Sequence, residues 1–100
     1  MAKRDKDQAL LDALRHPLRR DLLRRYMESK KKLSPRELAT LENKSLSLVS
    51  YHVRELVRLG AVEIADTKQV RGSVQHFYLA TARVKRSPLV RAALGMAQGG

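Results

Sequence analysis

The spacing of apolar residues changes from a helical to a strand period about two thirds of the way along the chain. Up to Leu59, apolar residues recur three or four positions apart, as they do on one face of a helix. After Gly60 they alternate with polar residues, as Val62 and Ile64 do with Glu63. The pattern therefore predicts a mostly helical fold that ends in a small β-hairpin.

Local start and stop signals divide the helical part into separate helices. Pro17 separates the first two, because the residue before a proline avoids the α region and a proline suits the first helical turn. Ser34, Pro35 and Glu37 have the spacing of a capping box that begins the third. Gly60 suits the position just after the last helix. The predicted helices cover residues 8–15, 17–29, 35–42 and 45–59.

The fourth of these helices has the clearest apolar stripe. Val49, Val53 and Leu56 recur at i, i+4 and i+7, which places them on one face. Either Ser45 or Ser47 can act as its N-cap. The opposite face is polar, so this helix is expected to pack with one side and expose the other.

The remaining third of the chain is expected to form the hairpin, a linker and a last short helix, whose apolar stripe contains Val90, Ala93, Leu94 and Ala97. Residues 62–65 and 74–79 alternate like strands, and a basic tip over residues 67–73 joins them, with Gly72 available for a positive φ. Leu33, before the third helix, is expected to add a short strand pairing. The whole chain is therefore divided into a polar tail over residues 1–7, a winged domain over 8–82, and a basic linker with a short C-terminal helix over 83–100, which is expected to contribute to dimerisation.

Composition narrows the classes of function. The chain has 100 residues, 43% of them hydrophobic, which suits one domain with one modest core. The absence of cysteine excludes disulfides and thiolate sites, and fits a reducing cytoplasm. The net charge of +11 alone predicts an anionic partner, in the order nucleic acid, anionic membrane surface, acidic protein. A membrane partner is not expected, because no apolar run approaches the ~18 residues of a membrane span and no helix sets a strong basic face opposite large aromatic residues.

The order of the predicted elements indicates which anionic partner the positive charge binds. Two short helices joined by a tight turn and followed by a hairpin are typical of a winged helix-turn-helix, in which the second helix enters the major groove of double-stranded DNA. The interpretation assigns the helix over residues 45–59 to base reading and the hairpin, or wing, to backbone contact. The predicted contacts from that helix are Ser45, Ser47, Ser50, Tyr51, Arg54 and Arg58. The predicted wing contacts are Lys68 and Arg71. The candidate phosphate contacts are Lys30, Lys31, Lys32, Arg36 and Lys44.

Three stretches carry a resemblance to a known family. They are "ALRHPLRRDLLRRY" at residues 13–26, "SPRELATLENKSLSLVSYHVRELVRLGAV" at 34–62 and "RGSVQHFYLA" at 71–80. Over about three quarters of its length the chain resembles the ArsR-like winged helix-turn-helix repressors of bacteria. The resemblance implies a recognition helix, a wing, and a dimer interface built from the first and last helices.

The chain also departs from that family. Many relatives carry Arg at the position of Tyr51 and a polar residue at that of Leu46, so Leu46 either contacts a thymine methyl group or faces solvent. Metal-sensing relatives place Cys on the third helix, or His and carboxylates on the last. Residues 35–42 contain no Cys or His, and residues 88–98 contain no His, Asp, Glu or Cys. No metal site of those types and no cofactor are therefore expected.

The three histidines do not suggest chemistry of their own. His52 lies at the edge of the apolar stripe, His16 at a helix junction, and His76 on the wing strand opposite in face to Phe77. We interpret the first two as packing residues. The chain has no phosphate-binding loop, nucleophile motif or carboxylate pair, so an enzyme is not expected.

The predicted function is sequence-specific DNA binding in the regulation of transcription, most simply as a repressor that acts as a homodimer on a palindromic operator. A single module reads few base pairs, and a dimer supplies the rest. The alternative is a winged-helix module that docks on an acidic protein or binds RNA. Arg83, Lys85 and Arg86 are expected to form a solvated linker. On the second helix, the side opposite the leucines is expected to face solvent with Arg20, Arg24 and Arg25. The residues predicted to form the dimer interface are Leu10, Leu11, Leu14, Val90, Ala93 and Leu94.

Overall fold

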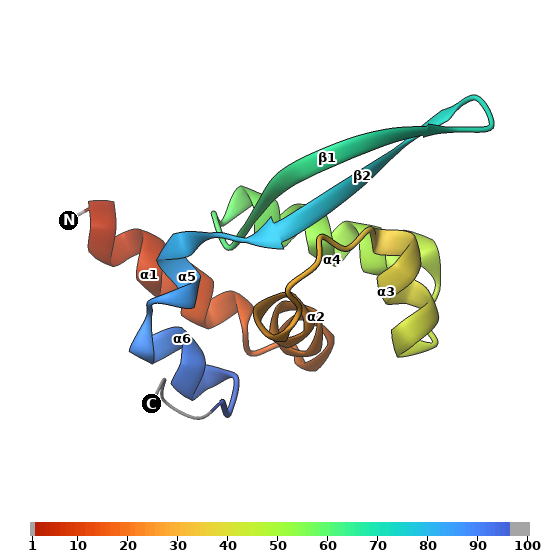
Figure 1. The fold of residues 1–100 in the computed structure, drawn as a ribbon. Coiled ribbons are helices and arrows are strands. Elements are labelled where there is room, and N and C mark those ends of the chain that lie inside the picture. Colours follow the sequence, from red (N-terminus) through yellow and green to blue (C-terminus); the bar gives the residue numbers. More distant parts are fainter. Residues whose placement is uncertain (1, 97–100) are drawn as a thin grey trace.

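Four helices, a two-stranded hairpin and two short helices follow one another along the chain (Figure 1). This computed structural model describes residues 2–96; Met1 of the predicted tail and Ala97, predicted for the last apolar stripe, lie outside that range, as do residues 98–100. The fold is the predicted winged helix-turn-helix, with one short helix added after the wing. The elements are α1 (Ala2–Ala13), α2 (Pro17–Glu28), α3 (Pro35–Glu42), α4 (Leu46–Arg58), β1 (Val62–Val70), β2 (Ser73–Ala80), α5 (Ala82–Lys85) and α6 (Pro88–Ala93).

Capping fixes the helix pair α3 and α4 as predicted. The Ser34 hydroxyl accepts from the Glu37 amide, and the Glu37 carboxylate accepts from the Ser34 amide, which completes the capping box. Asn43 closes α3 in the left-handed conformation, with φ 55°. The Ser45 hydroxyl then accepts from the Leu48 amide at 3.2 Å, so Ser45 rather than Ser47 is the cap of α4.

Two helix ends lie furthest from their predicted positions, while the others agree to within two residues. Helix α1 begins at Ala2, not near Gln8, because the polar segment contains no Gly or Pro and the Asp7 carboxylate is held by Arg83 at 3.0 Å. Helix α6 ends at Ala93, because Gly95 adopts φ 71° and turns the chain. Residues 2–7 of the predicted tail are therefore part of a helix, and the last helix ends before its predicted apolar stripe does.

The hairpin is longer than predicted, and its turn is tighter. The strands pair from Val62 with Ala80 to Val70 with Ser73, with a bulge between Ile64 and Asp66. Only Arg71 and Gly72 form the tip, and both have positive φ (48° and 82°), the pattern of a type I′ turn whose twist matches that of the strands.

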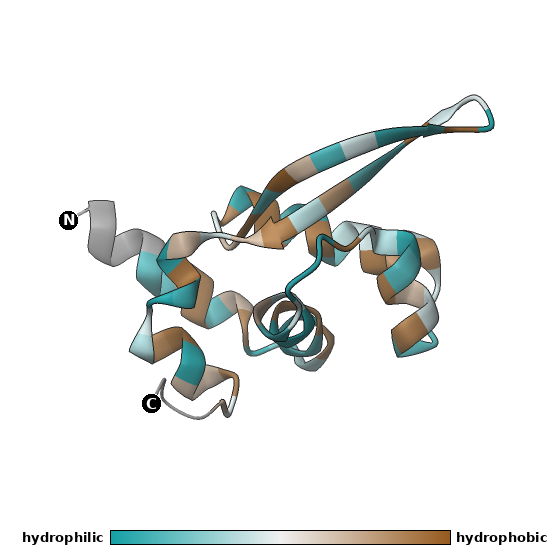
Figure 2. Ribbon diagram, in the orientation of Figure 1, coloured by the Kyte–Doolittle hydropathy of each residue, from teal (hydrophilic) through white to brown (hydrophobic). Residues whose placement is uncertain are grey.

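The pairing of the strands changes the place of one predicted wing contact. It also confirms the predicted strand pairing of Leu33. Lys68 lies within β1 opposite Gln75 instead of beside the turn. Leu33 pairs with Tyr78 of β2, as its position suggested. The wing extends away from the helices, and its hydrophobic segments lie mainly where the strands meet them (Figures 1 and 2).

The core lies among the helices and the base of the hairpin, and it contains most of the predicted dimer interface. Leu10, Leu14, Val90 and Leu94 are each at most 4% exposed within a single chain. These four side chains are therefore unavailable to a partner, and their assignment to a dimer interface was wrong. The reason is that a chain of this size needs the apolar faces of α1 and α6 to complete its own core.

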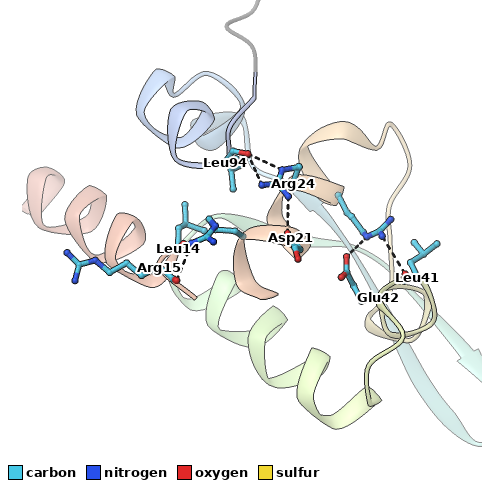
Figure 3. Close-up of polar contacts among 9 residues, drawn as sticks. Leu14, Arg15, Asp21, Arg24, Leu41, Glu42 and Leu94 are labelled. Atoms are coloured by element: carbon cyan, nitrogen blue, oxygen red, sulfur yellow. Dashed lines mark hydrogen bonds and ion pairs between the residues drawn. The ribbon is translucent and has the colours of Figure 1, made fainter. Parts of the chain in front are cut away.

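Arginines of α2 hold the C-terminal ends of other helices. Arg20 donates to the carbonyl of Leu14 just after α1 (3.0 Å), and Arg24 donates twice to that of Leu94 just after α6 (2.8 and 3.0 Å). Arg25 forms an ion pair with Glu42, the last residue of α3, at 2.5 Å (Figure 3). The last carbonyls of a helix lack internal partners and carry partial negative charge, so cations stabilise them.

These contacts overturn two sequence interpretations. Arg20, Arg24 and Arg25 were expected to face solvent, and Arg83 to sit in a solvated linker. Arg83 instead lies in α5 beside the buried Val84, and donates to the carbonyl of Leu59 at 2.7 Å. Part of the positive charge is therefore structural, since it binds helix ends within the chain.

Candidate nucleic-acid interface

Helix α4 packs one side against the core and exposes the other side to solvent. Val49, His52, Val53 and Leu56 are buried. Tyr51 on the opposite side is 50% exposed, and the Ser47, Arg54 and Arg58 side chains are exposed with it. An α-helix with its side chains is about 10–12 Å wide, which matches the ~12 Å major groove of B-DNA.

A groove of about 870 Å³ lies between this helix, the start of α3 and the wing. It brings together segments from residues 35 to 78 that are distant in the sequence. From α3 it is lined by Pro35 and Arg36; from α4 by Leu46, Ser50, Val53 and Arg54; and from the hairpin by Val70, Arg71, Ser73, Val74, Gln75, His76 and Tyr78.

Three arginines give this groove its charge. Arg36, Arg54 and Arg71 line it, and no acidic residue does so among the described residues. Their side chains are exposed, and none takes part in an ion pair within residues 7–96. They differ in this from the arginines that bind helix ends. Three unneutralised guanidinium groups around one groove suit a phosphate backbone.

Three other predicted DNA contacts are already engaged by partners within the chain. Arg58 forms an ion pair with Glu55 at 2.8 Å, which raises the pKa of Arg58 and lowers that of Glu55. Lys32 pairs with Asp66 at 2.5 Å and lowers the pKa of that carboxyl. Both cations are thus partly neutralised within the chain. The Ser45 hydroxyl is engaged as the cap of α4.

The remaining basic candidates are exposed but do not line the groove. Lys30 and Lys31 lie in the α2–α3 loop, Lys44 lies in the turn between α3 and α4, and Lys68 lies on β1. The structure thus brings together Ser50, Arg36, Arg54 and Arg71 of the predicted contacts in one groove, and these four lysines lie outside its lining.

Sequence reasoning missed the wing strand as a wall of the groove. Val74, His76 and Tyr78 alternate along β2 and all line it, and Ser73 and Gln75 join them toward the tip of the hairpin. Their period of two, already visible in the sequence, places them on one face of the strand. What the sequence did not show is which face of the hairpin turns toward α4.

His52 connects α4 to α2. Its Nδ1 accepts from the Arg19 side chain at 3.1 Å, and its ring lies 4.3 Å from that of His16 between centroids. Burial lowers the pKa of His52 below its usual value, the positive Arg19 and His16 add to this effect, and Glu55 opposes it. His52 is a packing residue, as predicted.

The described residues show neither a metal-binding cluster nor a membrane-spanning helix. No three His, Asp or Glu side chains in the described part of the chain are grouped so that they could hold a metal ion. None of the described helices has the length and hydropathy needed to span a bilayer.

Comparisons with known proteins agree with this geometry. Residues 15–63 match a family model described as winged helix-turn-helix DNA-binding, a match that covers α2 to the start of β1. The chain thus contains a winged helix-turn-helix DNA-binding domain of the kind found in transcription regulators. Among solved structures it is similar to reduced HlyU from Vibrio cholerae N16961, with a TM-score of 0.64 and 26% identity over 94% of this chain and 86% of that chain. No curated protein sequence matches the chain.

Proposed function

We propose that this protein is a sequence-specific, ArsR-like regulator of transcription that binds an operator as a homodimer and acts as a repressor. The observation that supports it best is the acid-free groove with Arg36, Arg54 and Arg71 between the recognition helix and the wing. A groove in that place would hold the sugar-phosphate backbone while α4 lies in the major groove and the wing lies beside it.

In this arrangement the side chains of α4 and of the wing tip contact different parts of the DNA. Ser47, Ser50 and Tyr51 lie along the outward side of α4, where they can donate to base edges or phosphates. Arg54, one helical turn beyond Ser50, can reach a guanine or a phosphate. Arg71 at the wing tip is placed for the backbone or a narrow minor groove.

The dimer must use the parts of α1 and α6 that the core leaves exposed, which include two of the six predicted residues. On α1 and α6, Leu11 and Ala93 remain partly exposed, and Leu89 is 60% exposed. A pair of domains would place two copies of α4 in successive major grooves, about 34–36 Å apart, and would require a palindromic site. Occupation of such a site within a promoter would block the polymerase.

A gel-shift titration tests the proposal. Duplex recovered from a random library by repeated binding would be labelled and then competed with random duplex and with RNA. We expect the complex to survive a large excess of both competitors. If random DNA displaced the selected duplex, sequence-specific binding would be contradicted. If RNA displaced it preferentially, the result would favour an RNA-binding module.

A further inference from the structure

The recognition helix begins with exposed apolar side chains where a reading helix would carry polar ones. Leu46 is 39% exposed and Leu48 is 42% exposed, one on each side of Ser47. Tyr51, half-exposed, follows one turn after Leu48. Single exposed leucines are common on protein surfaces, but two at the start of the helix assigned to base reading require an explanation.

The position of these side chains limits what they can contact. The N-terminal residues of a recognition helix approach base edges most closely. In the major groove, the apolar group on a base edge is the C5-methyl group of thymine, and all other reading atoms are hydrogen-bond donors or acceptors. A leucine cannot pair with a donor or an acceptor, so it would favour the methyl group and would desolvate the other edges at a cost.

The surroundings favour DNA over an apolar protein partner. Leu46 lines the same groove as Arg36 and Arg54, and Lys44 precedes the cap of α4. No acidic side chain lines that groove within the described residues. An apolar contact enclosed by unneutralised cations fits a polyanion that carries methyl groups, which is what thymine-containing duplex is.

We propose that Leu46 and Leu48 are specificity-determining residues that read thymine methyl groups in the major groove. The inference rests on the proposed function and adds to it a class of target: half-sites with thymines under the first turn of α4. The leucines contribute by burying methyl groups, while Ser47 and Tyr51 remain available for polar contacts.

Replacement of thymine by uracil tests this directly, because it removes the methyl group and leaves base pairing intact. Duplex selected from a random library would be prepared with thymine or with uracil at each position, and its dissociation constant measured by fluorescence anisotropy. At two or more half-site positions, we expect the uracil duplex to bind the wild type about fourfold more weakly per methyl group. Leu46→Asn and Leu48→Asn should each abolish part of that difference.

Leu41→Asn is the matched control, since Leu41 is an exposed leucine on α3 that does not line the groove, and it should keep the full preference for thymine. Circular dichroism would confirm that every variant is folded. Equal binding of thymine and uracil duplexes by the wild type would overturn the inference and leave the proposed function intact, and so would unchanged discrimination in both α4 variants. Failure to recover any duplex from the library would overturn both.

Discussion

The Arg83 guanidinium donates a 2.7 Å hydrogen bond to the carbonyl oxygen of Leu59, at the C-terminal end of α4. The same side chain forms a 3.0 Å ion pair with Asp7 of α1. A residue that follows the hairpin therefore binds the end of α4 and joins it to α1. The basic segment after the wing has a structural role that its sequence did not reveal.

Arg83→Ala should lower the free energy of unfolding by about 1–3 kcal/mol, because it removes a charged donor from a helix-end carbonyl and leaves Asp7 without its cation. Urea denaturation measures this. Arg86→Ala is the control, as an exposed arginine in the same segment, and should stay within about 0.5 kcal/mol of wild type. Equal stability of the two variants would show that the Arg83 contacts contribute little.

Arg71→Asn should separate the conformation of the wing tip from its charge. Arg71 has φ 48°, which costs a residue with a Cβ roughly 1–2 kcal/mol and is better tolerated by Asn. We expect unchanged or higher stability in urea, together with weaker binding to every duplex by anisotropy. A variant that binds DNA as tightly as wild type would remove Arg71 from the interface.

The stability of the fold should fall on mild acidification because of His52. The pKa of His52 in the fold lies below 6.5, its usual value, so the unfolded chain takes up the proton first as the pH falls. The contribution is fully present above pH 6.5 and is lost as the pH falls below it toward the lowered pKa. Urea midpoints at pH 7.5 and 5.5 measure the loss.

His52→Asn supplies the comparison for that experiment. An asparagine side chain can still accept from Arg19 but does not titrate, so the difference between the two pH values should shrink. His76→Asn is the control, because His76 lies on the wing, away from Arg19, and should keep the wild-type difference. The interpretation fails if His52→Asn changes with pH as much as the wild type does.

The oligomeric state should depend on Leu89. Light scattering after size exclusion at micromolar concentration should give the mass of two chains for the wild type and of one chain for Leu89→Glu. Because Leu89 is 60% exposed, Leu89→Glu should keep the fold of the single chain, which circular dichroism would confirm. A wild-type mass of one chain would contradict the dimer.

Much of the fold follows from local sequence signals. The capping box at Ser34, the cap at Ser45 and the left-handed Asn43 are short-range interactions, so residue type and spacing suffice to predict them. The change of period after Gly60 predicted the hairpin in the same way. Its length was underestimated because a tip of Arg71 and Gly72 needs an arginine at positive φ, which propensity alone disfavours.

The candidate site depended more on tertiary contacts. Sequence reasoning named Arg36, Arg54 and Arg71, but it could not distinguish them from Arg20, Arg24 and Arg25, which have the same chemistry. The distinction is whether a helix end lies within reach, and only the packing of α2 decides that. The same limit explains Leu10 and Leu94, since an apolar stripe looks alike whether it covers a core or a partner.

The salt dependence of DNA binding tests the central claim most directly, namely that these three arginines form the DNA interface. The slope of log K against log salt would be measured for the wild type and for a triple variant, Arg36→Gln, Arg54→Gln and Arg71→Asn. Each lost phosphate contact should reduce the slope by about 0.9, hence by about 2.7 per subunit for three contacts. Arg24→Gln, which alters a helix-end contact instead, should keep the wild-type slope. An unchanged slope in the triple variant would contradict the account.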